Sequence, residues 1–68
     1  MNQFILNGEV LNIEQKLTIQ ELVHKITKGK VDGIAVAMNG TIVSRNKWHI
    51  QEVLEGSQID IVESFQGG

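Results

Sequence analysis

The chain contains no cysteine and no proline. Without a thiol it cannot form disulfides, thiolate metal sites, nucleophilic thiols or persulfides of its own. Its two imidazoles, His24 and His49, lie far apart with no metal-ligand spacing around them, so a zinc site is not expected. Because proline is absent, no residue lacks the backbone N–H that strands and helices use.

Aromatic residues and clustered charge are also scarce. The aromatic side chains are Phe4, Trp48 and Phe65, and six basic residues are interleaved with eight acidic ones for a net charge of −2. Proteins that bind nucleic acids usually present a basic stripe with stacking aromatics. We therefore expect no nucleic-acid partner.

No run of apolar residues approaches the roughly 20 that span a membrane. The opening segment "MNQFILNGEV" lacks the positive region and the long apolar core of a signal peptide. We therefore expect a cytoplasmic protein with no membrane association. The content of 41% hydrophobic and 21% charged residues is typical of globular proteins, and the length of 68 residues predicts a single domain, residues 1–68.

Two Asn-Gly pairs predict β-hairpins. Asn7-Gly8 separates the runs "NQFIL" and "EVLNI", and Asn39-Gly40 separates "IAVAM" from "TIV". Asn-Gly suits a two-residue type I′ turn, in which both central residues have positive φ. The predicted register of the first hairpin pairs Phe4 with Leu11, Ile5 with Val10 and Leu6 with Glu9. Both faces of this hairpin carry apolar groups, so the alternation does not choose its inward face.

The segment "TIQELVHKITKG" predicts one amphipathic helix of about three turns. Its apolar residues follow the spacing of a single helical face: Ile19, Leu22, Val23 and Ile26. Thr18 and Glu21 have the spacing of a capping box at its start. Gly29 stands where a left-handed C-cap belongs.

The remaining segments predict further strands around an irregular stretch. In "IAVAM" and "QIDIVES" large apolar residues occupy alternate positions, as in strands with one buried face. Between them, "SRNKWHIQEVLEGS" has no regular period, and we expect four apolar side chains to point inward: Trp48, Ile50, Val53 and Leu54. This order of elements predicts an α+β fold with the helix packed on a mixed, four- to five-stranded sheet.

Nothing in the sequence predicts catalysis. The phosphate-binding motifs GxGxxG and GxxxxGK[ST] are absent, and no cleft is predicted around the acidic residues. Trp48 is interpreted as a core anchor. Arg45 has three open roles: pairing with Glu63, pairing with Asp60, or contact with an acidic partner protein. We expect a protein that is not itself an enzyme and binds no cofactor.

Five segments carry a family resemblance through their order and spacing: "FILNGEV", "TIQELV", "IAVAMNG", "IVSRNKW" and "EGSQIDIVESFQGG". Together they resemble the ThiS family, the ubiquitin-like sulfur carriers of thiamin thiazole biosynthesis. The resemblance spans the whole chain and implies a β-grasp fold with a flexible C-terminal Gly-Gly tail, residues 65–68. The chain departs from the family at Ser57, where Asp is common, and at Phe65-Gln66, where smaller aliphatic residues are usual.

The resemblance implies that Gly68 is the reactive residue. A ThiF-like relative of the ubiquitin-activating enzymes uses ATP to adenylate its carboxyl group, and sulfur from a persulfide donor protein displaces AMP to leave a thiocarboxylate. A ThiG-like thiazole synthase then takes up the sulfur. The tail residues Phe65, Gln66 and Gly67 enter the partner's active site, where glycines let the backbone approach the nucleotide closely.

The resemblance to ubiquitin-like carriers also implies that partner proteins dock on the open face of the sheet. Strand alternation directs Ala35, Ala37 and Val62 away from the helix, so these three residues are the candidate partner interface. Single exposed apolar residues are, however, ordinary on protein surfaces. For Phe65, one expectation is docking in a partner and the other is folding back onto the domain.

Several alternatives stay open. The small subunit of molybdopterin synthase has the same fold and thiocarboxylate tail, although those chains tend to carry an inserted segment that this sequence lacks. A carrier for cysteine, methionine or tRNA thiolation is a further sulfur-transfer role. The other two are a non-catalytic β-grasp protein-binding domain with incidental glycines and a protein modifier joined to lysines by isopeptide bonds.

Overall fold

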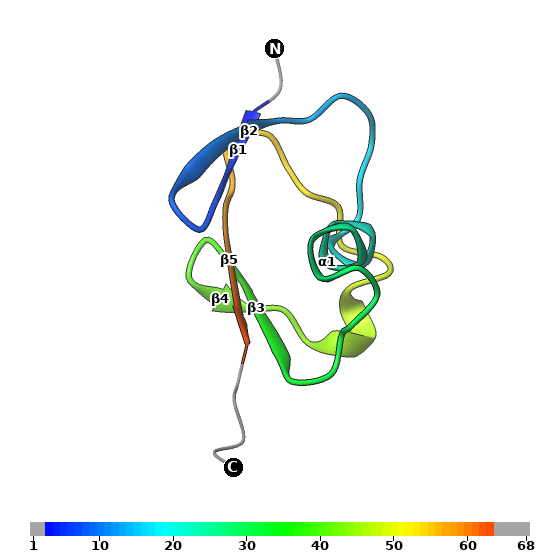
Figure 1. Ribbon diagram of the computed structural model, residues 1–68. Coiled ribbons are helices and arrows are strands. Elements are labelled where there is room, and N and C mark those ends of the chain that lie inside the picture. The colour runs from blue at the N-terminus through cyan, green and yellow to red at the C-terminus, as the bar shows by residue number, and fades with distance from the viewer. Residues whose placement is uncertain (1–2, 64–68) are drawn as a thin grey trace.

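The computed structural model describes residues 3–63, which form five strands, one α-helix and a short 3-10 helix. The α-helix lies to one side of the strands (Figure 1). In chain order the elements are β1 (Gln3–Leu6), β2 (Glu9–Asn12), α1 (Ile19–Thr27), β3 (Ile34–Met38), β4 (Thr41–Ile42), η1 (Arg45–Lys47) and β5 (Gln58–Glu63).

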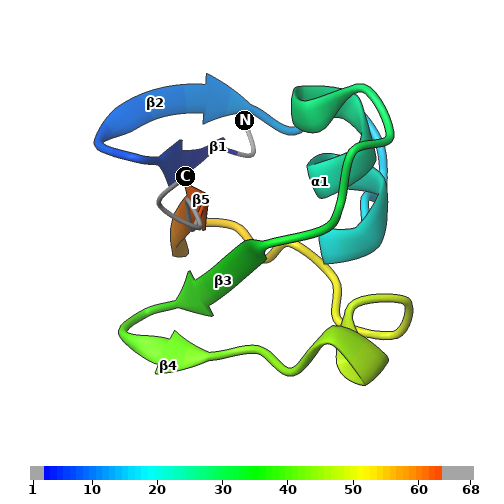
Figure 2. The same cartoon turned by 60° about the horizontal axis from the view of Figure 1, so that its bottom comes forward.

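The strands form one mixed sheet in the order β2-β1-β5-β3-β4, which Figure 2 shows from β2 to β4 down the picture. β5 is central and runs parallel to β1 but antiparallel to β3. Each outer strand is the hairpin partner of its neighbour. The predicted α+β class and mixed sheet are confirmed, and the arrangement is that of the β-grasp fold.

Both Asn-Gly pairs form the predicted turns. Asn7 and Gly8 have φ of 48° and 87°, and Asn39 and Gly40 have φ of 52° and 84°. Positive φ at both central residues is the signature of the type I′ turn. The first hairpin has the predicted register, with Phe4 opposite Leu11, Ile5 opposite Val10 and Leu6 opposite Glu9.

The helix begins at the predicted capping box. The Thr18 hydroxyl accepts a hydrogen bond from the Glu21 N–H at 3.1 Å, and the Glu21 carboxylate accepts one from the Thr18 N–H at 2.9 Å. At the other end, left-handed backbone begins at Lys28, with φ of 56°, and continues at Gly29, with φ of 88°. The predicted left-handed end is therefore present, but it starts one residue before Gly29.

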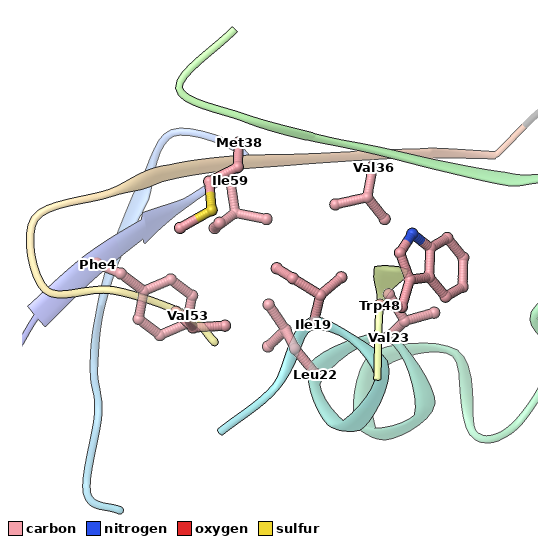
Figure 3. Close-up of a cluster of buried hydrophobic side chains, with 9 residues drawn as sticks. All are labelled: Phe4, Ile19, Leu22, Val23, Val36, Met38, Trp48, Val53 and Ile59. Atoms are coloured by element: carbon pink, nitrogen blue, oxygen red, sulfur yellow. The ribbon is translucent and has the colours of Figure 1, made fainter. Parts of the chain in front are cut away.

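The core lies between α1 and the sheet, as Figure 3 shows. The helix contributes Ile19, Leu22 and Val23 from its first five residues. The predicted fourth member of this face, Ile26, is 42% exposed, because the core cluster packs against the start of the helix and not against its last turn. Among residues 3–63 the buried cluster comprises Phe4, Ile19, Leu22, Val23, Val36, Met38, Trp48, Val53 and Ile59.

The irregular segment before β5 corrects one prediction. Trp48 and Val53 are buried as expected, but Ile50 and Leu54 are exposed. The Val53 N–H donates to the Leu17 carbonyl at 2.8 Å, which fixes this backbone against the residues that precede α1. Trp48 and Val53 are directed inward, whereas Ile50 and Leu54 face solvent. No period in the sequence distinguishes the buried pair from the exposed pair.

Candidate partner-binding surface and the C-terminal strand

The face of the sheet opposite α1 is predominantly apolar. Val36, Met38 and Ile59 point into the core, so the residues that alternate with them point to the opposite side. The polar residues Gln3, Asn12 and Gln58 also point to this side. We use the name outer face for the other seven residues on it: Ile5, Val10, Ala35, Ala37, Ile42, Asp60 and Val62.

The three predicted interface residues lie together on this face. Ala35 is opposite Val62 in the β3–β5 ladder, and Ala37 is opposite Asp60. Val62 is 59% exposed and Ala35 is also exposed, whereas Ala37 is half-buried. The predicted placement of these residues on an open sheet face is confirmed, and their role as an interface stays a prediction.

The structure adds two large apolar residues to this surface. Ile42 is opposite Ala37 in the β3–β4 hairpin and is 69% exposed. Val10 is opposite Ile5 on the same face, in the edge strand β2, and is 57% exposed. The position of Ile42 on this face was predictable from the two-residue turn before β4, because that turn sets the pairing of Ile42 with Ala37. For Val10 the sequence offered no choice between the two faces of the first hairpin.

The side chains of the two turn asparagines bind the main chain of β5. Asn7 Oδ1 accepts a hydrogen bond from the Ile61 N–H at 2.8 Å, and Asn7 Nδ2–H donates to the Ile61 carbonyl at 3.3 Å. Asn39 Oδ1 accepts from the Gln58 N–H at 2.9 Å, while the Asn39 N–H donates to the Gln58 carbonyl at 2.7 Å. The sequence assigned these asparagines only a turn role, so their contacts with β5 were missed.

The chain reaches Glu63, the last described residue of β5, beside the outer face. The predicted tail residues Phe65, Gln66, Gly67 and Gly68 lie outside the described residues. Their predicted roles therefore stay predictions.

Arg45 and Trp48 form a separate group next to η1. Trp48 is buried, and its indole Nε1–H donates a hydrogen bond to the Val43 carbonyl at 3.0 Å, which confirms it as a core anchor. The Arg45 guanidinium lies 5.7 Å from the centre of the indole ring and pairs with Asp32 at 3.7 Å. Its intramolecular partner is thus neither of the predicted acids, Glu63 and Asp60.

No described group has the composition of a metal site. Within residues 3–63, no three His, Asp or Glu side chains gather where they could hold a metal ion. A groove of about 360 Å³ beside β4 contains Lys47 as its one ionisable side chain, the others being Met38, Thr41, Ile42, Val43, Ser44, Ile50 and Gln51. The helix of this part of the chain is too short to cross a membrane.

Comparison with known families decides the relationship. The model of the ThiS family matches residues 3–68. The chain belongs to the ThiS family. This confirms the resemblance carried by the five sequence segments. It supports the predicted role of a sulfur carrier in thiamin biosynthesis, and it fits a small carrier protein rather than an enzyme.

Two solved structures show the same fold as this ThiS-family chain. The crystal structure of the thiamine biosynthesis protein ThiS from Geobacter metallireducens has a TM-score of 0.80 at 19% identity, covering 97% of this chain and 99% of that one. The solution structure of a thiamine biosynthesis protein from the same organism has a TM-score of 0.77 at 21% identity, covering 100% of this chain and 88% of that one. No curated protein matches the chain.

Proposed function

We propose that this protein carries sulfur as a thiocarboxylate on Gly68 and donates it for thiamin thiazole formation. The observation that supports this proposal most directly is the ThiS-family match, which extends through residue 68. The sheet topology adds support. The central strand β5 ends beside the outer face, and the chain continues from β5 to Gly68.

The chemistry requires an activating partner. An α-carboxyl group has a reference pKa of about 3.3–3.7, so it is ionised at neutral pH and is a poor electrophile. Attack of the carboxylate on the α-phosphorus of ATP forms an acyl-adenylate and releases pyrophosphate. The terminal sulfur of a persulfide donor then attacks the acyl carbon and expels AMP. Cleavage of the resulting S–S bond by a thiol leaves the thiocarboxylate.

The two glycines suit this chemistry. Without Cβ atoms, Gly67 and Gly68 can enter a narrow channel and bring the backbone close to the nucleotide. Residues 64–68, when fully extended, span roughly 16 Å. This reach separates the reactive carboxyl group from the surface that binds the partner. The same tail can therefore serve a ThiF-like adenylating enzyme and then a ThiG-like thiazole synthase.

The outer face is the proposed docking surface for these partners. On this face apolar groups surround a single carboxylate, that of Asp60. They belong to Ala35, Ile42 and Val62. Exposed apolar side chains that become buried in a complex supply much of the binding free energy, whereas most polar contacts supply specificity. The expected cytoplasmic location stays a prediction.

The test is the intact mass of the protein after incubation with ATP, a ThiF-like enzyme and a persulfide donor. The expected product is heavier by the difference between one sulfur and one oxygen atom, and fragmentation places this change on Gly68. A chain that lacks Gly68 is the control and is expected to keep its mass. An unchanged mass for the wild-type chain, with an activating enzyme shown to be competent on another carrier, would exclude the proposal. A change located on an internal side chain would exclude it as well.

A further inference from the structure

The side chain of Asn7 takes the place of a main-chain segment next to β5. The paired residues of β1 and β5 are Ile5 with Gln58 and Leu6 with Ile59, and the Asn7 N–H donates to the Ile59 carbonyl at 2.9 Å. In a regular parallel ladder, the next bond would join the Ile61 N–H to the main-chain carbonyl of Asn7. Here the Ile61 N–H is bound instead by Asn7 Oδ1.

The hairpin turn explains why a side chain binds β5 here in place of the main chain. With φ of 48°, Asn7 directs the chain away from β5 and into β2. The Asn7 side-chain amide has an N–H donor and its acceptor oxygen on the same side, and it binds both the N–H and the carbonyl of Ile61. Asparagine also tolerates left-handed backbone better than most residues. One residue therefore forms the turn and extends the pairing of β5.

This contact lies close to the end of the described chain. On its other side β5 is paired with β3 as far as Ile34 and Glu63. The Asn7 amide thus binds the edge of β5 that faces β1, two residues before Glu63, the last described residue. Loss of this support leaves the final residues of β5 held by β3 alone. Fraying there would release residues of β5 that must be ordered again when a partner binds the chain end, and ordering each residue has an entropic cost.

We propose that Asn7 is a positioning residue for the chemistry at the chain end: its two hydrogen bonds with Ile61 hold the last described residues of β5 in the sheet. This inference rests on the proposed function. Asn7 touches neither ATP nor the reacting carboxyl group in this scheme. It acts through β5, so its loss should slow the reaction after docking more than it weakens the binding of the partner.

The chain offers a matched control in its second Asn-Gly turn. Asn39 also has positive φ and also binds the main chain of β5 through its side chain. Its contact is with Gln58, at the start of β5 and away from the tail. Asn7→Gly and Asn39→Gly both keep a residue that accepts positive φ, and both remove the side-chain amide. Asn7→Asp keeps the acceptor for the Ile61 N–H and removes the donor to the Ile61 carbonyl.

The experiment measures kcat and KM for adenylation of the full chain by a ThiF-like enzyme, through ATP–pyrophosphate exchange. Assays are run well below the lowest of the melting temperatures, so that every variant is folded. For Asn7→Gly we expect kcat to fall about tenfold while the KM for the carrier changes less than about twofold. Asn7→Asp is expected to be intermediate, and Asn39→Gly to match the wild type. Amide hydrogen exchange should accelerate at Ile61 in Asn7→Gly and at Gln58 in Asn39→Gly.

The outcomes separate this inference from the proposed function. If the wild-type chain is not adenylated, the proposed function fails and this inference fails with it. If the wild-type chain is adenylated and the Asn7→Gly and Asn39→Gly variants have the same kcat, the positioning role alone is wrong. Equal losses of kcat in both variants would likewise overturn it, because they would reflect a general loosening of β5.

Discussion

Ala35 on β3 lies directly opposite Val62 on β5, on the sheet face that α1 does not cover. The two side chains belong to strands that are distant in sequence but adjacent in the sheet. Their pairing brings two apolar groups together at the end of β5 that leads to the tail. An apolar pair in this position suits the partner docking proposed above.

The first prediction concerns binding at this pair. Val62→Ser removes exposed apolar area from the outer face, and we expect the Kd for a ThiF-like enzyme to rise about tenfold, measured by calorimetry. Leu54→Ser is the control, because Leu54 is 52% exposed and Val62 is 59% exposed, but Leu54 lies in the irregular segment before β5 and not on the outer face. Leu54→Ser should change the Kd less than about twofold. Equal effects of the two substitutions would show that the outer face is not the docking surface.

The second prediction concerns the glycine tail. Gly67→Ala places a methyl group where the proposed channel has room only for backbone, and we expect adenylation to fall by about a hundredfold or more. Deletion of Gly68 should abolish it. Neither change removes a core residue, so the melting temperature followed by circular dichroism should be that of the wild type. A large drop in melting temperature would show that the tail has a structural role instead.

The third prediction contrasts the two faces of the sheet by making the same Ile→Val change on each face. Ile59 is fully buried, whereas Ile42 is 69% exposed. Removing a methylene from the core costs transfer free energy and leaves a cavity, so Ile59→Val should lower the free energy of unfolding by about 1 kcal/mol. Ile42→Val should change it by less than about 0.5 kcal/mol. Urea denaturation measures both values, and a larger loss for Ile42→Val would contradict the assignment of the two faces.

The fourth prediction concerns the capping box of α1. Thr18→Ala removes the hydroxyl that accepts the Glu21 N–H, and the free energy of unfolding should fall by about 1 kcal/mol. Thr18→Ser retains a hydroxyl and should cost less than about 0.5 kcal/mol. The same denaturation series measures both. If serine and alanine were equally destabilising, the methyl group of Thr18 rather than its hydroxyl would be the stabilising part.

Short-range features were predictable because few residues determine them. The Asn7-Gly8 turn set the register of the first hairpin, since a two-residue loop allows one pairing of the flanking strands. The Thr18 and Glu21 capping box likewise involves atoms within one turn of helix. The ThiS-family resemblance rested on such local segments in order, and the family match confirmed it.

Predictions failed where the position of a side chain depends on distant parts of the chain. Ile50 and Leu54 are as apolar as their buried neighbours, but Trp48 and Val53 occupy the space beside α1. For Arg45 the sequence left three roles open, and its pairing with Asp32 depends on how the chain brings the segments before β3 and after β4 together. No periodicity in an irregular segment contains this information.

The sequence by itself determined the turns, the helix and its cap, the alternation within each strand and the family, because these follow from backbone geometry over a few residues and from ordered motifs. The tertiary structure alone decided which face of the first hairpin is buried and how β5 is held. Asn7 and Ile61 are separated by 54 positions in the sequence and meet only because β5 is inserted beside β1. That insertion is driven by burial of apolar side chains from the whole chain at once, which no local pattern specifies.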